Sequence, residues 1–403
     1  MHASLALDPS VASPVPELLH GGESAFRRIL ERISTAQRSI LIRCFDWRDD
    51  ETGELVARHL LAAADRGVEV TVLKDRVGCT YEYLEGTRSS FFHKEIDFLA
   101  RMQTWCLMAG YGRWGSFQQR ESELASALLR HQNVTIARHE KRFDHSKLYV
   151  FDDDTLVLGG MGIGDDFRCH NVDFMVEVRG HEAVHRFTER YRGRVDFDPE
   201  RDIDYLLHSF RAEGRSSLIE DRLSLIDEAK SRLTIEMAYL GDRRCTDALV
   251  AAVGRGVEVT LLTSRRANII ADLNLQTCNE LLQRTGSPEH LNIILHPRMV
   301  HGKAIVADGE RVDIGSANFT RLSHGAYEEV NLYSSQPVFA REVERAILAD
   351  SKAGERAIRT VRYRRAYAAV ELALSHYHGG RGSSLRSAEK PSLGRSLSRE
   401  EPG

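Results

Sequence analysis

The sequence contains no long apolar run, and none of its apolar stretches approaches the roughly 18 to 20 residues that a helix needs to cross a bilayer. Its first residues, Met1 to Pro16, lack the basic segment followed by an apolar one that is typical of a signal peptide. We therefore expect a cytoplasmic protein with neither a signal peptide nor a spanning helix.

The cysteines show no metal-binding pattern. There are six of them, scattered along the chain, with no CxxC pair and no histidines at zinc spacing. The acidic run Asp152–Asp154 is typical of a solvated turn rather than of a metal site. We expect free thiols in a reducing compartment, no bound metal and no other cofactor.

The sequence also has no excess of basic residues: it contains 55 Lys and Arg and 59 Asp and Glu, which gives a net charge of −4. This balance gives no general attraction to nucleic acid. The charge is uneven, however: from Ser351 to the end, eleven basic side chains stand against five acidic ones. The C-terminal region is therefore the candidate for contact with an anionic surface.

The hexapeptide RGVEVT occurs twice, at Arg66–Thr71 and Arg255–Thr260, each time between a helical pattern and a β-branched one. Upstream of each copy, an amphipathic helical pattern runs into another strand-like segment. The order strand, helix, strand implies a crossover connection. We predict an α/β fold of two duplicated halves, each with a mixed, largely parallel sheet flanked by helices.

These patterns divide the chain into five segments. We predict an N-terminal extension (1–20), a first half (21–200), a second half (201–350), a basic C-terminal helix (351–378) and a disordered tail rich in Gly, Ser, Arg and Pro (379–403). The first half carries an additional aromatic segment near 80–130. Its aromatic residues either line an entrance for lipid or acceptor, or pack an inserted helix.

Two stretches share one frame: HSKLYVFDDDTLVLGGMG from position 145 and HGKAIVADGERVDIGSAN from position 301. In each, Lys follows His by two residues, Asp by seven, a Gly-Gly or Gly-Ser pair begins after fourteen, and an acid follows after twenty-eight. The frame contains His145, Lys147, Asp152, Gly160 and Asp173 in the first half, and His301, Lys303, Asp308, Ser316, Asn318 and Glu329 in the second.

This set matches the needs of phosphodiester cleavage by double displacement. Side chains two apart on a strand share a face, so each histidine projects together with its lysine. The reaction requires an attacking group, an acid for the leaving alkoxide and cations over the phosphoryl oxygens. Asp173 and Glu329 are candidates to orient the histidines, although the sequence does not say which acid serves which. Small residues such as Gly160 let backbone amides and the side chains of Ser316 and Asn318 approach a phosphate oxygen.

These residues resemble the HKD motif of the phospholipase D superfamily, HxKxxxxD followed by GG or GSxN, in two copies. GGMGIGDDF, GSANFT and EEVNLY resemble the bacterial cardiolipin synthase branch. The resemblance implies two halves packed about a pseudo-twofold, one shared site and a metal-free phosphohistidine intermediate. One residue departs from the family pattern: Gly162 stands where the first motif usually has Asn.

The same resemblance assigns roles to the residues of the two motifs. It implies that His145 is the nucleophile and His301 the acid, and that Lys147, Lys303 and Asn318 hold phosphate. It also implies that Asp152 and Asp308 shape the motif rather than react.

The leading hypothesis is a phosphatidyltransferase that attacks a phospholipid such as phosphatidylglycerol and passes the phosphatidyl group to an alcohol, as cardiolipin synthases do, or to water. We expect peripheral membrane association through the basic, aromatic stretch Arg356–Tyr377. The alternative is a nuclease or phosphodiesterase, which the acidic body disfavours. A degenerate binding protein is disfavoured by the retained histidines and lysines. Acceptor and oligomeric state are left open.

Overall fold

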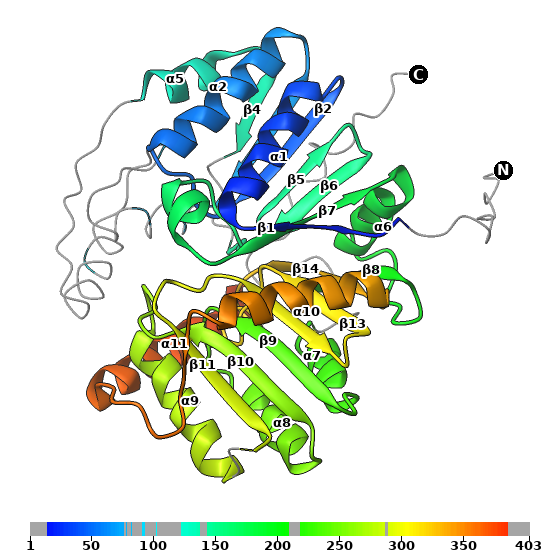
Figure 1. The fold of residues 1–403 in the computed structure, drawn as a ribbon. Coiled ribbons are helices and arrows are strands. Elements are labelled where there is room, and N and C mark those ends of the chain that lie inside the picture. Colours follow the sequence, from blue (N-terminus) through cyan, green and yellow to red (C-terminus); the bar gives the residue numbers. More distant parts are fainter. Residues whose placement is uncertain are drawn as a thin grey trace.

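The structure is a computed structural model of the 403-residue chain. It describes residues 14–75, 78, 82, 91, 92, 102, 122–137, 143–208, 218–286 and 289–385. Figure 1 shows two α/β halves, one above the other, each with a central sheet and helices against it.

The first half is built on a seven-stranded sheet with the order β1-β7-β6-β5-β2-β3-β4. Its strands are β1 (Glu17–His20), β2 (Ser39–Cys44), β3 (Glu69–Lys74), β4 (Val134–Ala137), β5 (Leu148–Phe151), β6 (Thr155–Gly159) and β7 (Phe174–Arg179). Its helices are α1 (Gly22–Thr35), α2 (Glu51–Asp65), α5 (Glu123–Arg130), the short π-helix η1 (Asp166–His170) and α6 (His181–Tyr191).

The second half is built on an eight-stranded sheet with the order β15-β11-β10-β9-β12-β13-β14-β8. Its strands are β8 (Ile203–His208), β9 (Arg232–Met237), β10 (Glu258–Ser264), β11 (Leu291–His296), β12 (Lys303–Ala307), β13 (Arg311–Gly315), β14 (Glu329–Ser334) and β15 (Glu355–Arg356). Its helices are α7 (Leu218–Asp227), α8 (Arg243–Gly254), α9 (Ala271–Thr285), α10 (Pro337–Ser351) and α11 (Arg365–Leu385).

The repeated RGVEVT forms the same junction in both halves. Its arginine ends the helix and reaches back to carbonyls near the end of the preceding helix: Arg66 donates to the Ile33 carbonyl at 3.1 Å and Arg255 to the Ile226 carbonyl at 3.0 Å. Its glycine then turns the chain with a positive φ, 94° at Gly67 and 87° in the second copy. The valines that follow are buried in the cores. The repeat therefore encodes a helix end, a turn and a core strand.

The α/β class and the two mixed sheets are confirmed, but a smaller fraction of the strand pairs is parallel than predicted. Among the described strands, parallel pairing joins only β2, β3 and β4 in the first sheet and β9, β10 and β11 in the second. The strand after each HxK motif returns through a tight turn, and such a turn can only join antiparallel strands. The central residues of both turns have positive φ: 54° and 55° at Asp152 and Asp153, 57° and 69° at Asp308 and Gly309.

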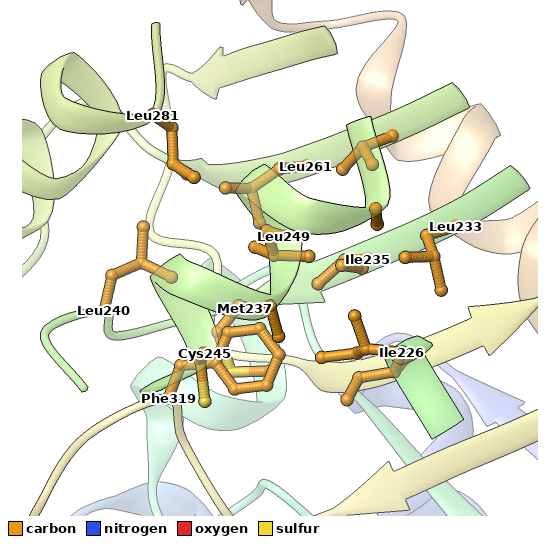
Figure 2. Packing of buried hydrophobic residues seen from close by; sticks show 14 of the residues in the cluster. Ile226, Leu233, Ile235, Met237, Leu240, Cys245, Leu249, Leu261, Leu281 and Phe319 are labelled. Atoms are coloured by element: carbon orange, nitrogen blue, oxygen red, sulfur yellow. The ribbon is translucent and has the colours of Figure 1, made fainter. Parts of the chain in front are cut away.

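Each half has its own apolar core, and a third cluster joins them. Figure 2 shows the second core, where Leu249 of α8 lies among Ile235 of β9, Leu261 of β10 and neighbouring side chains. The joining cluster takes buried residues from both halves, including Phe174 of β7 and Leu332 of β14. Because this cluster lies on the strands that follow the motifs, burial of its apolar surface also fixes the relative position of the two motifs.

Three segments differ in detail from the expected boundaries. Residues 17–20, assigned to the N-terminal extension, form β1 at the edge of the first sheet. The basic segment begins with β15, and its helix α11 begins only at Arg365 and runs to Leu385, past the expected start of the tail. Side chains of α9 hold the intervening chain, because Asn279 accepts from the Val361 amide and Asp272 from the Arg364 amide, both at 2.7 Å.

The aromatic segment near 80–130 lies mostly outside the described residues. Phe91 and Phe92 are described and buried, with ring centroids 5.2 and 5.1 Å from that of Trp47. These two residues therefore pack in the core. Tyr81, Tyr83, Trp105, Trp114 and Phe117 lie outside the described residues.

Candidate active site

The two HxK motifs meet where the halves join. The amide of His145 donates to the carbonyl of Glu328 at 2.9 Å, and the amide of His301 donates to the carbonyl of Val172 at 2.7 Å. Glu328 and Val172 each directly precede the acid that the motif frame places after twenty-eight residues. The backbone therefore aligns each histidine with the acid of the other half.

The side chains complete this crossed arrangement. Nδ1 of His145 lies 3.0 and 3.1 Å from the two carboxylate oxygens of Glu329, and Nδ1 of His301 lies 2.8 Å from Oδ2 of Asp173. Each carboxylate accepts the hydrogen on Nδ1, which leaves the Nε2 lone pair of a neutral ring available to a phosphorus atom. The question that the sequence left open, which acid serves which histidine, is answered: each acid serves the other half's histidine.

Each carboxylate that contacts a histidine makes a further hydrogen bond. Oδ1 of Asp173 accepts from the Phe174 amide at 2.8 Å. The hydroxyl of Ser316 donates to Oε2 of Glu329 at 2.5 Å and accepts from the Val330 amide at 3.0 Å. Gly160 occupies the matching frame position in the first half, and a Cβ there would lie 2.6 Å from Oδ1 of Asp173. Gly160 thus leaves space for the Asp173 carboxylate, and the Ser316 hydroxyl orients the Glu329 carboxylate. Phosphate contact by Gly160 and Ser316 stays a prediction.

Asn318, the third predicted phosphate ligand, lies in the loop after β13 and is 3% exposed. Its amide oxygen has no hydrogen-bond partner among the described residues. No hydrogen bond within the described residues therefore fixes the Asn318 side chain through its oxygen atom.

The two lysines are buried beside the histidines. Lys147 donates to the backbone carbonyl of His145 at 2.6 Å, and Lys303 Nζ lies 3.0 and 3.2 Å from the ring nitrogens of His301. Burial lowers the pKa of Lys303 to about 7, with Asp173 opposing the shift, and burial also lowers the pKa of Lys147. A phosphodiester brings a negative charge, which favours the protonated form of both amines. The site is therefore suited to an anionic group.

Both histidines are neutral at neutral pH in this environment. Burial lowers the pKa of His301 to about 4, and the charge of Lys303 acts in the same direction. Burial also lowers the pKa of His145, against the opposing charge of Glu329. The negative charge of a bound phosphodiester raises both pKa values, so one imidazole can carry the proton that a leaving group requires.

The surroundings of the two histidines differ. Beside His145, buried Arg43 bonds Asp144 at 2.5 Å and Glu328 at 3.2 Å. Beside His301, Val172 and Val300 occupy the matching bridge, and the position matching Arg43 is Glu236. These flanking residues were not singled out from the sequence, although aligning SILIRCF with RLTIEMAY shows the change of charge.

Burial raises the pKa of Glu236 well above its usual range, which favours the neutral form of this carboxyl. A Cβ at Gly302 would lie 2.1 Å from Oε1 of Glu236, which explains why the second motif reads HGK rather than HSK. A cluster of charged side chains therefore lies behind His145, and a single buried carboxyl lies behind His301.

The motif aspartates lie away from the histidines, in the turns after β5 and β12. Asp152 accepts from the backbone amides of Gln37, Arg38 and Ser39. Asp308 accepts from three amides at the start of β9, those of residues 230 to 232, and from the hydroxyl of Ser231. Burial raises the pKa of Asp308, but these donors outweigh it and bring the pKa to about 2. The contacts support a role in shaping the motif.

The family model described as "Cardiolipin synthase, PLD-like domain" matches residues 29–194 and 223–350. Cardiolipin synthase A of Pseudomonas aeruginosa is 24% identical over 363 residues, which cover 85% of this chain and 68% of that protein. The major cardiolipin synthase ClsA of Bacillus subtilis is 22% identical over 371 residues, covering 85% and 69%. These relatives are distant.

Solved structures show the same fold. The phosphatidylserine synthase of Haemophilus influenzae superposes with a TM-score of 0.66 at 12% identity, over 92% of this chain and 95% of that one. At this identity the match concerns the fold alone. The family match covers both halves, and the two HxK motifs meet in one site within it. The chain therefore belongs to the phospholipase D superfamily and is an enzyme of that superfamily.

Proposed function

We propose that the protein is a phosphatidyltransferase that resembles cardiolipin synthases in activity, with a phospholipid such as phosphatidylglycerol as donor and an alcohol or water as acceptor. The observation that carries this proposal is the pair of crossed histidine–carboxylate contacts, with two buried lysines between the halves. The named relatives supply the lipid class.

In the first step, Nε2 of His145 attacks phosphorus while the bond to the headgroup oxygen breaks, and His301 gives its proton to the leaving alkoxide. In the second, the acceptor hydroxyl gives its proton to His301 as its oxygen attacks phosphorus, and the bond to His145 breaks. Glu329 stabilises the charge on the His145 ring throughout. Lys147 and Lys303 offset the charge of the phosphoryl oxygens. The scheme uses no cofactor.

The basic segment offers a surface for peripheral membrane docking. Ile358 and Val370 are 68% and 57% exposed, and Arg359, Arg362 and Arg365 are exposed beside them. Exposed apolar side chains among arginines suit an anionic bilayer surface. No helix in the described part of the chain is both long and apolar enough to span a bilayer.

This surface is linked to the active site through α9. Arg364 pairs with Asp272 at the start of α9 at 2.7 Å. Just before α9, Asn268 bonds the hydroxyl of Tyr239, whose ring centroid lies 6.2 Å from that of His301. Docking through the basic segment therefore brings the part of the site near His301 toward the lipid.

Docking is tested by sedimentation with vesicles of phosphatidylglycerol and phosphatidylcholine. We expect the triple variant Arg359→Glu, Arg362→Glu and Arg365→Glu to lose binding. A matched control reverses three exposed arginines elsewhere, Arg58, Arg194 and Arg243. Equal binding by the two variants would contradict the docking surface.

The activity is tested with phosphatidylglycerol vesicles in the presence of EDTA, with products followed by mass spectrometry. We expect cardiolipin from the wild type and no product from His145→Ala. Phosphatidic acid alone would assign hydrolysis. No lipid turnover, together with salt-sensitive cleavage of single-stranded DNA that is lost in His145→Ala, would replace the lipid proposal with a nuclease.

A further inference from the structure

The pseudo-twofold pairs Asp46 and Gly162 with Tyr239 and Asn318. A parallel bridge joins Trp47 to Ile163 in the first half, and another joins Leu240 to Phe319 in the second. The residues just before each bridge are Asp46 and Gly162 in one half, Tyr239 and Asn318 in the other. The two halves therefore present different groups at one equivalent place beside the site.

In the first half, a carboxylate fills the space beside the glycine. A Cβ at Gly162 would lie 2.1 Å from Oδ1 and 2.7 Å from Cγ of Asp46. No larger residue fits there while Asp46 keeps its position. The departure from the family pattern at Gly162 is thus one half of a coupled pair.

The Asp46 carboxylate is buried with one oxygen uncommitted. The residue is 6% exposed, its Oδ2 lies 3.5 Å from a guanidinium nitrogen of Arg48, and its Oδ1 has no hydrogen-bond partner among the described residues. A buried carboxylate oxygen without a donor is unfavourable, so a ligand that donates a hydrogen bond gains from meeting it.

The neighbours of the Asp46 carboxylate contact both histidines. The ring of Phe45, its chain neighbour, is 4.8 Å from that of His145. The ring of Phe167, which also borders the Gly162 position, is 5.3 Å from that of His301. Burial lowers the pKa of Lys147, and the charge of Asp46 is the largest one opposing that shift. Asp46 therefore lies within the candidate active site.

We propose that Asp46 determines acceptor specificity by accepting a hydrogen bond from a second hydroxyl of a polyhydric alcohol such as a glycerol headgroup. The inference rests on the proposed two-step transfer. A carboxylate cannot donate to a phosphate oxygen and repels it, whereas the amide of Asn318 in the other half can donate. The first half thus offers an acceptor for hydroxyl groups where the second offers an amide.

The test is a competition between glycerol and 1-propanol for the phosphohistidine intermediate, with both alcohols at equal concentration. Both acceptors attack the same intermediate, so the ratio of the two products does not depend on how fast it forms. We expect the wild type to favour glycerol and Asp46→Asn to lower the product ratio about tenfold, since a hydrogen bond to a charged group contributes at least that factor. The control Asp153→Asn removes one charge from an exposed turn and should keep the ratio.

A second variant reaches the same group without changing charge. Gly162→Ala places a methyl group against Oδ1 of Asp46, so the carboxylate must move and the ratio should fall again. Thermal unfolding of each variant checks the fold. A ratio within twofold of the wild type in folded Asp46→Asn, or in folded Gly162→Ala if Asp46→Asn does not fold, would overturn the inference.

The donor separates this inference from the proposed function. The competition is run with phosphatidylglycerol vesicles and, in parallel, with bis(4-nitrophenyl) phosphate. Turnover of the nitrophenyl donor alone would reject the lipid assignment, and its product ratio would still decide the role of Asp46. A wild type that shows no preference for glycerol would reject the role of Asp46 whichever donor reacts. Turnover of neither donor would reject both proposals.

Discussion

Glu329→Gln is the sharpest test of the crossed site, because it keeps the shape of the side chain and removes its charge. In the wild type, both carboxylate oxygens lie near Nδ1 of His145, and Ser316 donates to one of them. The side chain of Glu329 has no exposed surface, so solvent cannot replace the lost charge.

The size of the effect follows from which way the new amide faces. If its oxygen faces His145, the charged character of one buried hydrogen bond is lost, about 1.5 to 3 kcal/mol, or roughly 10-fold to 150-fold in rate. If its NH2 group faces the ring, the hydrogen moves from Nδ1 to Nε2 and the nucleophile is blocked, a loss on the order of 10^4-fold. We therefore expect a loss of at least tenfold.

The assay is the pre-steady-state burst of nitrophenolate from bis(4-nitrophenyl) phosphate, which reports formation of the phosphohistidine. Ser316→Ala serves as the matched comparison, since it removes one hydrogen bond to Glu329 but keeps the carboxylate, and we expect a smaller loss. A Glu329→Gln burst rate within threefold of the wild type, with an unchanged unfolding midpoint, would refute the assigned role of the crossed pair.

Three further predictions follow from the same contacts. Asp173→Asn should retain most of the nitrophenolate burst, because that leaving group needs no acid, but lose turnover of an alkyl diester; equal losses would contradict His301 as the acid. His324 is another buried histidine, with Nδ1 2.8 Å from the carboxylate of Asp242. Burial lowers the pKa of His301 and His324 from 6.5 to about 4, so the unfolded chain binds more protons between these values. The melting temperature should therefore fall as the pH drops through this window, and less steeply in His324→Gln; parallel curves would argue against this origin. Asp308→Ala should lower the free energy of unfolding by about 2 to 3 kcal/mol in urea titrations while each folded molecule stays active, and loss of activity without loss of stability would give Asp308 a chemical role.

The sequence predicted the two halves because their signals are local. RGVEVT specifies a helix end, a positive-φ turn and a core strand within six residues, so its repetition marks the duplicated unit. The spacing of the motif frame likewise singled out Asp173 and Glu329, and both contact a motif histidine, while the catalytic roles of these residues stay a prediction.

What could not be predicted depends on how the halves pack. Pairing within a half and pairing across halves give the same spacing in sequence, and only the bridges beside Val172 and Glu328 decide between them. The close approach of Asp46 to Gly162 also joins segments that are distant in the sequence. From the sequence, Gly162 therefore indicates only that the usual asparagine side chain is absent. The parallel share was overestimated because strand, helix, strand units were visible in the sequence, whereas the antiparallel hairpins after the motifs were not counted.

The crossed contacts make catalysis conditional on assembly. Each half alone carries a histidine, a lysine and an acid, but its acid contacts the histidine of the other half. Any movement that separates the halves removes both carboxylates from the histidine rings at once, so the proposed nucleophile and the proposed acid would be disabled together rather than one after the other. Under the proposed mechanism, a partly folded chain with one half formed and the other open could therefore not start the reaction and stop at the phosphohistidine.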